Sequence, residues 1–321
     1  MTLISARSRV CLFATTAALV AALISACGSS SQGGSTQANT SASAFPVTIR
    51  TAAGPVKISH RPRRIVSLSP SATEDLFALG AGAQVVAVDS DSTLPRNAPH
   101  TALSAYHPNV EAIAKYRPDL VVISDDINHI AEQLAKLGVP VLNYPAPSNL
   151  AGAYAQLTQL GQATGDAAGA RRAITSMRDQ IAAIVRSVPR PSHQLSVYHE
   201  LDQTYYAADS RTFIGQIYKL FGLRNIADKA AKTSNYPQLS SEYIIASDPN
   251  LIVLADTVCC AQTPAKVAAR PGWKNIAAVK TGGVVPVNDA LASEWGPEVV
   301  QFVRTIAAAL KRLEADQHAG G

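Results

Sequence analysis

Two stretches of the chain show the same order of polar and apolar positions. Residues 111–125 read EAIAKYRPDLVVISD and residues 242–256 read EYIIASDPNLIVLAD, with a constant offset of 131. In each stretch a short helical segment ends at a proline, because the residue before proline disfavours the helical region. The unbroken apolar run that follows is typical of a strand buried on both faces of a parallel sheet. The pattern therefore predicts the same helix-then-strand unit in both halves.

The flanking segments continue the alternation of strands and helices. In the first half, the pattern predicts strands over 64–68, 85–88 and 139–142, and helices over 71–79 and 129–137. In the second half, it predicts strands over 195–198 and 284–287, and helices over 212–221 and 297–313. Residues 47–50 and 56–58, on either side of Gly54-Pro55, predict a hairpin. Such alternation favours α/β lobes with mainly parallel sheets.

One long helix separates the two halves. Residues 166–188 carry apolar side chains at helical spacing and contain no proline before Pro189. We therefore expect an N-terminal lobe over 45–165, a connecting helix over 166–190 and a C-terminal lobe over 191–321. In open α/β sheets, ligands bind at the carboxyl ends of the strands. The fold class expected is two similar α/β lobes joined by one long α-helix, with a ligand cleft between them.

The N-terminus has the form of an export signal. Arg7 and Arg9 precede an uncharged apolar run that is too short to span a membrane comfortably. The segment Ile24-Ser25-Ala26-Cys27 resembles the bacterial lipobox, which implies a signal peptide over 1–26 and diacylation of Cys27. Residues 28–44 are rich in Gly, Ser and Thr, so residues 27–44 are expected to form a lipidated, flexible tether. The predicted location is the outer face of the cell membrane.

Composition and motifs narrow the function classes. Charged residues make up 16% and hydrophobic residues 47%, which is unlike a disordered chain. The net charge of +5 comes without a clustered basic stripe, which argues against nucleic-acid binding. No GxSxG, HExxH, P-loop or Rossmann glycine motif occurs, which disfavours an exported enzyme. Seven scattered histidines do not supply a zinc or manganese site, so no metal ligand set is predicted.

Only two cysteines follow Cys27, and they are adjacent. In an oxidising compartment Cys259 and Cys260 could form a vicinal disulfide. Bridging neighbouring residues strains the intervening peptide, so two separate thiols are the favoured expectation.

Several segments together resemble a known family of binding proteins. They are RIVSLSPSATEDLFALGAG, VVAVDSDSTLP, NVEAIAKYRPDLVVIS, YPQLSSEYIIASDPNLIVL and VVPVNDALASEWGPEVV. This set is similar to the substrate-binding proteins of ABC importers for iron-siderophores, heme and vitamin B12, over about residues 46–313. The resemblance implies a non-catalytic protein that carries a ferric siderophore, a corrinoid or heme to a permease and ATPase complex. We expect it to be a monomer.

The same resemblance implies two docking carboxylates. In this family one glutamate on each lobe meets arginines of the permease, and the matching positions are Glu74 in SATE and Glu242 in LSSE. Two separated carboxylates can steer a protein onto a basic pair in one orientation. Each also has a structural alternative. Ser71 and Glu74 have the spacing of a capping box, and Glu242 is an acid in a first helical turn.

The candidate cleft residues follow strands or precede helices. They are Tyr106, His107, Tyr198, His199, Glu200, Tyr205, Tyr206, Arg211, Tyr236 and Trp295. Aromatic faces suit a flat chelate or corrin, and His107 is a weakly supported candidate ligand to heme iron. The cobalamin-binding relatives have an acidic and a basic residue after the last strand, whereas residues 289–294 contain no basic residue, which argues against cobalamin. The alternative function is a heme-binding scavenging or sensory lipoprotein without a permease.

Overall fold

The N-terminal lobe consists of an antiparallel hairpin followed by a parallel sheet. A computed structural model describes residues 45–51, 53–191 and 193–319, and the predicted signal peptide, Cys27 and the tether lie outside them. The hairpin strands are β1 (Val47–Thr51) and β2 (Gly54–Ile58), so Gly54 and Pro55 lie in the second strand rather than in the turn. Five parallel strands follow, in the spatial order β5-β4-β3-β6-β7. They are β3 (Ile65–Leu68), β4 (Val85–Asp89), β5 (His100–Leu103), β6 (Leu120–Ile123) and β7 (Val141–Asn143).

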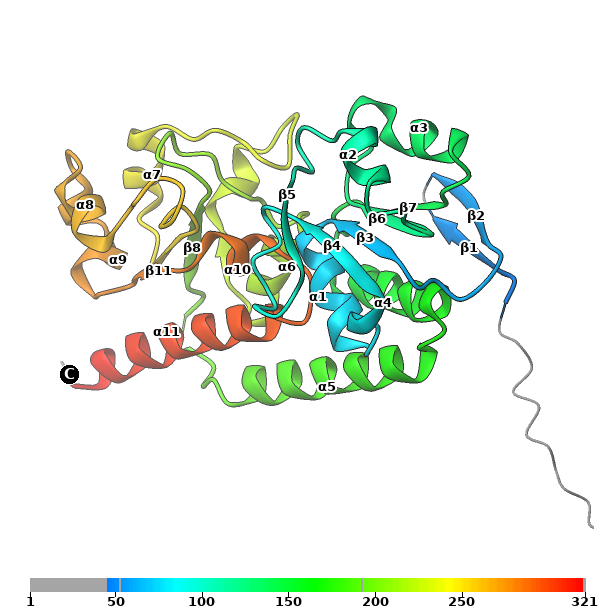
Figure 1. Cartoon of the computed structure of the whole chain (residues 1–321). Helices are drawn as coiled ribbons and strands as arrows, with labels where there is room; N and C mark the ends of the chain where they lie inside the picture. Colours follow the sequence, from blue (N-terminus) through cyan, green and yellow to red (C-terminus); the bar gives the residue numbers. More distant parts are fainter. Residues whose placement is uncertain (1–44, 52, 192, 320–321) are drawn as a thin grey trace, which may run out of the picture. The chain divides into compact units, whose positions relative to one another are not determined.

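The first three helices of this half of the chain are short, and the last two are longer (Figure 1). They are α1 (Pro70–Ala78), α2 (Val110–Ala114), α3 (Ile130–Lys136), α4 (Leu150–Thr164) and α5 (Ala167–Arg186). Short 3-10 turns lie at Gly82–Gln84 and Ile127–His129.

The C-terminal lobe contains a second parallel sheet, in the spatial order β11-β10-β8-β9. Its strands are β8 (Ser196–Glu200), β9 (Arg224–Asn225), β10 (Leu251–Leu254) and β11 (Val284–Pro286). Its helices are α6 (Phe213–Leu220), α7 (Ser241–Ser247), α8 (Pro264–Ala269), α9 (Ala277–Lys280), α10 (Asp289–Ser293) and α11 (Val299–Ala319). Short 3-10 turns lie at Ile226–Lys229 and Trp273–Asn275.

The sequence repeat is a structural repeat. β6 pairs with β3 in the first lobe as β10 pairs with β8 in the second, and all four strands are buried. The residue after the proline has the same role in both lobes. The backbone N–H of Asp119 donates to the carbonyl of Arg64 at 3.0 Å, and that of Asn250 to the carbonyl of Ser196 at 3.0 Å. In return, each side-chain oxygen accepts from the backbone N–H of the opposite residue at 2.9 Å.

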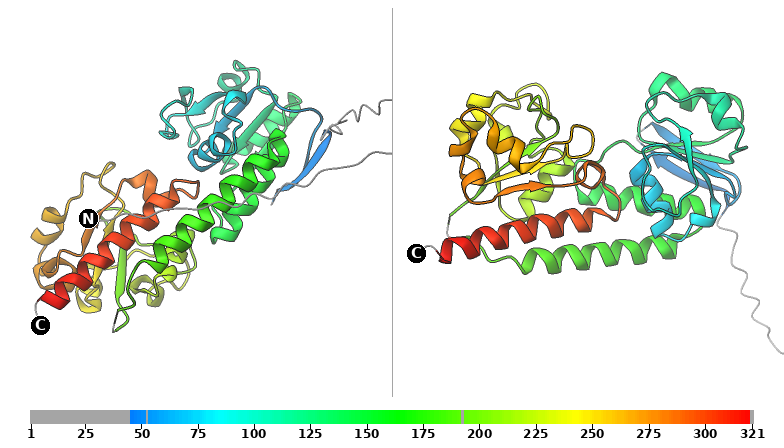
Figure 2. Two further views of the ribbon diagram at one scale, coloured as in Figure 1. Left: turned by 90° about the horizontal axis from the view of Figure 1, so that it is seen from below. Right: turned by 60° about the vertical axis from the view of Figure 1, so that its left-hand side comes forward.

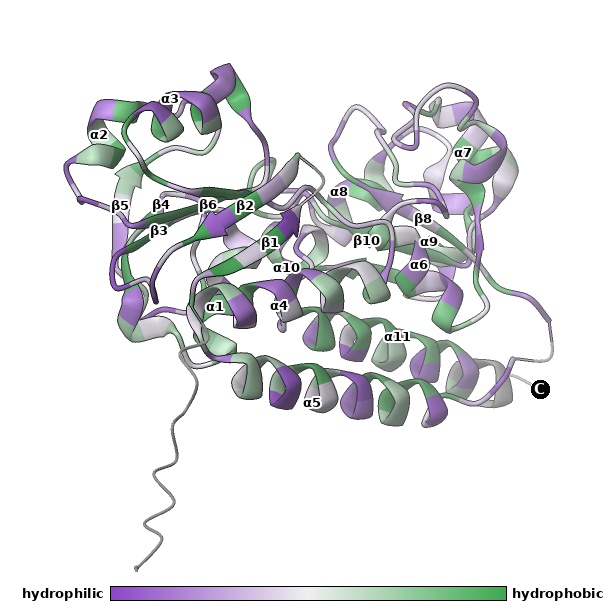
Figure 3. Ribbon diagram, turned by 90° about the vertical axis from the view of Figure 1, so that its right-hand side faces the viewer, coloured by the Kyte–Doolittle hydropathy of each residue, from purple (hydrophilic) through white to green (hydrophobic). Residues whose placement is uncertain are grey.

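Two long helices carry both lobes. α5 occupies the predicted connecting segment, and α11 packs beside it (Figure 2). Apolar and polar residues alternate in stripes along α5 (Figure 3), with Ala170, Ile174, Met177 and Ile181 buried. One apolar cluster runs from Ile49 in the hairpin to Leu313 in α11, so the lobes share a continuous core.

The sequence pattern did not predict α4. Gly152 and Gly161 lower the helical propensity of this segment by about 1 kcal/mol each relative to alanine. A Cβ on Gly161 would meet the Cβ of Ala170 in α5 at 2.5 Å. The glycine that weakens the helical signal is therefore the residue that lets α4 approach α5 closely.

In the part of the chain that the structure describes, no helix is both long and apolar enough to cross a membrane.

Candidate functional site

A small acidic cavity lies at the carboxyl edge of the first sheet. It has a volume of about 50 Å³, and residues at the ends of, or just after, β3, β4, β5 and β6 form its walls. The lining residues are Pro70, Asp89, Asp91, Ala105, Tyr106, Ser124, Asp125 and Ile127. Tyr106, one of the predicted cleft residues, is 66% exposed, so its ring is accessible from solvent. His107 is also exposed, and its backbone N–H donates to the Ser104 hydroxyl.

Negative charge converges on this cavity. Asp89 is fully buried at the end of β4, where its Oδ1 accepts from the Ser92 backbone N–H at 3.0 Å. Its Oδ2 is buried and has no hydrogen-bond partner among the described residues. Burial raises the pKa of Asp89. Burial, followed by the charges of Asp91, Asp89 and Asp125, raises the pKa of the Tyr106 phenol, because each disfavours a phenolate there.

The carboxyl edge of the second sheet carries a buried ion pair. Both terminal guanidinium nitrogens of Arg270 donate to the Glu200 carboxylate, at 2.6 and 2.5 Å, and Nη2 also donates to the Gln262 side-chain oxygen at 3.0 Å. The guanidinium lies 4.5 Å from the ring centroid of Trp273, which itself stacks on Tyr205. Glu200 is therefore fully engaged by the protein and is not free to bind a ligand, contrary to the sequence-based expectation.

A second carboxylate lies against this ion pair. Asp256, at the end of β10, is fully buried, and neither of its oxygens has a hydrogen-bond partner within the described chain. Burial and the Glu200 charge raise the pKa of Asp256 to about 7, while Arg270 opposes this shift. Asp256 is the counterpart of Asp125 in the repeat, but Asp125 is exposed at the first sheet.

Two further predicted cleft residues belong to the core. Tyr198 is fully buried and meets Trp273 edge to face. His199 is also fully buried, and its Nδ1 lies 2.6 Å from the Tyr218 hydroxyl. Burial lowers the pKa of His199 to about 3, so the ring is neutral at pH 7. Both positions lie in β8, which is buried on both faces, and this contradicts the expectation that they line a cleft.

Two of the other predicted cleft tyrosines of the second lobe are accessible. Tyr206 and Tyr236 are both exposed, and they lie on segments that pair through an antiparallel bridge between Tyr206 and Gln238. Tyr205 is half-buried against Trp273. The Arg211 side chain is largely exposed and binds the buried Asp209 carboxylate, so its charge is already paired.

The loop after β10 contains the two adjacent cysteines. The structure joins Cys259 and Cys260 in a disulfide, which contradicts the expectation of two thiols. The Asp289 carboxylate accepts from the backbone N–H groups of Val258 and Cys259, at 2.9 and 2.7 Å. Val258 is exposed at the surface of the loop.

Residues 294–298 form a strap from the second lobe onto the first. The backbone N–H of Trp295 donates to the Ser71 hydroxyl at 3.0 Å, and its indole N–H donates to Gln156 in α4 at 2.9 Å. The backbone N–H of Glu298 donates to the Glu74 carboxylate at 3.0 Å. Trp295 thus packs against α1 and α4.

The strap changes the interpretation of Glu74. This carboxylate is 5% exposed, whereas docking requires an exposed one. The predicted capping box is also wrong, because Ser69 caps α1 by accepting from the Ala72 backbone N–H. Burial and the adjacent Glu74 raise the pKa of Glu294 to about 10, so Glu294 is protonated at pH 7. By contrast, Glu242 in α7 is exposed, and hydrogen bonds from its own backbone N–H and from Ser240 lower its pKa.

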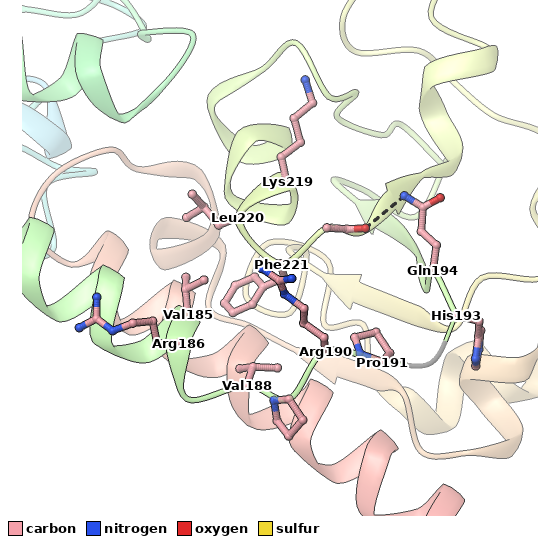
Figure 4. Close-up of a pocket in the computed structure, with 12 residues that line it drawn as sticks. Val185, Arg186, Val188, Arg190, Pro191, His193, Gln194, Lys219, Leu220 and Phe221 are labelled. Atoms are coloured by element: carbon pink, nitrogen blue, oxygen red, sulfur yellow. Dashed lines mark hydrogen bonds between the residues drawn. The ribbon is translucent and has the colours of Figure 1, made fainter.

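A larger cavity, of about 800 Å³, lies elsewhere (Figure 4). It is lined by the end of α5, the linker to β8 and the end of α6, with the cations Arg186, Arg190 and Lys219 around it. Gln194 and Gly222, joined by a 3.2 Å hydrogen bond, place it at the amino ends of β8 and β9. Since ligands of parallel sheets bind at the carboxyl ends, we do not assign this cavity as the ligand site.

The sequence analysis missed four residues that lie at the carboxyl edges of the two parallel sheets. Asp89 and Asp91 end or follow a strand, and that position was the available signal for them. Arg270 and Trp273 lie between predicted elements, and no local pattern distinguishes them. Among the residues whose placement is described, no group of three or more His, Cys, Asp or Glu side chains is arranged to hold a metal ion.

Comparisons with known proteins agree on the type of protein. A family model described as periplasmic binding protein matches residues 65–290. A cobalamin-binding protein of Halobacterium salinarum is 34% identical over 278 residues, covering 84% of this chain and 75% of that protein. An uncharacterized ABC transporter substrate-binding lipoprotein of Bacillus subtilis is 28% identical, covering 91% of this chain and 94% of that protein. The crystal structure of a periplasmic heme-binding protein of Vibrio cholerae has a TM-score of 0.68 and 26% identity, covering 77% of this chain and 98% of that one.

Proposed function

The chain belongs to the periplasmic binding protein family, and from that premise we propose that it binds a bulky metal chelate for an ABC importer. The ligand classes are a ferric siderophore, a corrinoid or heme. The observation that carries the proposal is the set of accessible tyrosines, Tyr106, Tyr206 and Tyr236, next to the carboxyl edges of the two parallel sheets. Broad aromatic faces with few polar anchors suit a large, flat ligand.

Membrane attachment through Cys27 is part of the proposal. Its support is the Ile-Ser-Ala-Cys segment behind an apolar run, together with the relative named as a lipoprotein. A diacylated cysteine followed by a polar tether would keep the binding domain close to a permease. Metabolic labelling with a radioactive fatty acid tests this, because Cys27→Ser abolishes the label if Cys27 is the acylated residue.

Docking to the permease is proposed to use Glu242, which is exposed. Glu74 can take part only after the Glu298 backbone N–H releases it, since that contact holds it in the interior. Charge reversal at Glu242 tests its docking role. Glu242→Lys should abolish uptake and leave ligand affinity within about twofold, because the Glu242 side chain is exposed and does not line the cavity at the first sheet. Unchanged uptake by Glu242→Lys would remove the docking role.

The burial of Glu74 favours one alternative function. A heme-binding scavenging or sensory lipoprotein would need no permease, and therefore no exposed pair of carboxylates. Deleting the gene distinguishes the two functions. A transport protein is required for growth on the chelate as sole source of its metal or cofactor, whereas a scavenger only changes the amount bound at the surface.

The ligand class is tested by direct titration. Residues 45–321, which fall within one compact unit, are titrated with cyanocobalamin, hemin and a panel of ferric siderophores by calorimetry. Saturable binding of one class at micromolar concentration or below supports the proposal. The absence of binding by every chelate would refute the metal-chelate assignment and leave the family unchanged.

A further inference from the structure

The acidic cavity at the first sheet is charged in a way that would select ligands by the charge of their side arms. Three carboxylates line it, from Asp89, Asp91 and Asp125, while its lining contains no lysine, arginine or histidine. An anionic group entering this cavity would lose hydration and meet only negative charge. A group with N–H donors or a positive charge would instead find acceptors on several sides.

One acceptor in the cavity is unused. Asp89 lines the cavity, and its Oδ2 is buried. Among the described residues, this oxygen has no hydrogen-bond partner. A buried carboxylate oxygen without a donor is unfavourable, because its lost hydration is not replaced by a hydrogen bond. The other oxygen is fixed by the Ser92 backbone N–H, which holds the carboxylate in one orientation. Oδ2 is therefore an acceptor without a donor on a residue at the wall of the cavity.

The size of the cavity limits what can enter. Its volume of about 50 Å³ is several times the roughly 10–15 Å³ that a cavity needs to hold one water molecule. A whole chelate is far larger, but a single primary amide or ammonium group is of the right size. Tyr106, 66% exposed beside the cavity, can cover the apolar stem of such an arm.

We propose that this cavity is a subsite for a primary amide or ammonium arm of the ligand, with the Asp89 carboxylate as the acceptor. This inference rests on the proposed function and refines its ligand class. It selects chelates with neutral amide arms or a positive charge, such as an amide-bearing corrinoid or a cationic ferric hydroxamate. It selects against chelates whose periphery is anionic, such as ferric tris-catecholates and heme with its propionates.

The test compares matched aspartate variants of residues 45–321. Asp89→Asn keeps an oxygen for Ser92 and places an NH₂ group where the acceptor was. Asp125→Asn removes a charge from the wall. Asp126→Asn is the control, because Asp126 is adjacent and exposed, does not line the cavity, and caps α3 through the Ala131 backbone N–H, a contact that asparagine can keep.

The probes are cyanocobalamin, ferrioxamine B, ferric enterobactin and hemin, titrated at pH 7 in low and high salt. For whichever amide or ammonium probe binds, we expect a 10- to 100-fold loss of affinity with Asp89→Asn, the range for a charge-assisted hydrogen bond. Asp125→Asn should cost less, and more of its effect should disappear in high salt. Asp126→Asn should remain within about twofold of the wild type.

Two outcomes overturn the inference, and they differ in what they leave standing. Tight binding of hemin or ferric enterobactin, unaffected by Asp89→Asn, would refute the subsite and leave the proposed function intact. Binding of none of the four probes, by a protein with native circular dichroism, would refute the proposed function itself and with it the subsite.

Discussion

Replacing Arg270 with methionine tests whether the buried ion pair organises the second lobe. Glu200 is fully buried, and the Arg270 side chain is only 12% exposed. Methionine keeps much of the contact with Trp273 and removes both guanidinium hydrogen bonds. The variant leaves Glu200 as an unpaired buried carboxylate beside Asp256, and breaking a buried pair in this way costs about 3–5 kcal/mol.

The expected change in melting temperature follows from the size of the protein. An unfolding entropy of about 2.1 cal/mol/K per residue, over about 270 residues, gives about 0.57 kcal/mol/K. A loss of about 3–5 kcal/mol therefore lowers Tm by about 5–9 °C. Scanning calorimetry at pH 7 measures this directly. Adding Glu200→Gln should recover at least half of the loss, since it removes the stranded charge.

A surface pair provides the control for this experiment. Lys136 binds Glu132 one helical turn away, with both side chains about two-thirds exposed. Lys136→Met should cost no more than about 0.5 kcal/mol, or about 1 °C. If Arg270→Met costs no more than Lys136→Met, or if Glu200→Gln gives no recovery, the ion pair does not organise this edge of the sheet.

Three further predictions concern protonation and packing. Burial lowers the pKa of His199 to about 3, whereas an unperturbed histidine has a pKa of about 6.5. Between these two pH values the unfolded chain binds one more proton than the folded chain. The free energy of unfolding therefore falls by up to about 1.4 kcal/mol for each pH unit below 6.5. His199→Asn should remove that part of the acid sensitivity in urea unfolding at pH 7, 6 and 5, and equal slopes for the two proteins would contradict it. Glu294 is neutral at pH 7, so Glu294→Gln should change the free energy of unfolding by less than about 1 kcal/mol, whereas Glu294→Asp should cost more by opening a gap beside Glu74. A Cβ on Gly296 would overlap the Glu74 carboxylate, so Gly296→Ala should destabilise the protein by about 1–3 kcal/mol. Most of that loss should disappear when Glu74→Ser is added. No recovery in the double variant would show that the strain lies elsewhere.

The elements that sequence predicted best are those with one strong local signal. The unbroken runs of β6 and β10 and the proline-free apolar spacing of α5 were enough to place them. The family expected from the motifs is confirmed by the match over residues 65–290. α4 was missed because its glycines obscure a helix that depends on packing against α5.

The candidate site was predicted less well because burial and pairing are long-range properties. Tyr106 is exposed in a loop beside the acidic cavity, and its position after strand and turn signals is a local feature of the sequence. Tyr198 and His199 were misplaced because a strand buried on both faces offers no alternation to show which side chains face a ligand. Glu200 finds its partner 70 residues later in Arg270, and no spacing in the sequence indicates that pair.

The strap also sets an order of events during synthesis. The partner of Glu74 is the backbone N–H of Glu298, which is added to the chain 224 residues later. At translation rates of about 5–20 residues per second, Glu298 is added to the chain roughly 10–45 s after Glu74. During that interval, the Ser71 hydroxyl and the Glu74 carboxylate face solvent or a chaperone. The lobe that is made first therefore gains its last contacts only near the end of synthesis.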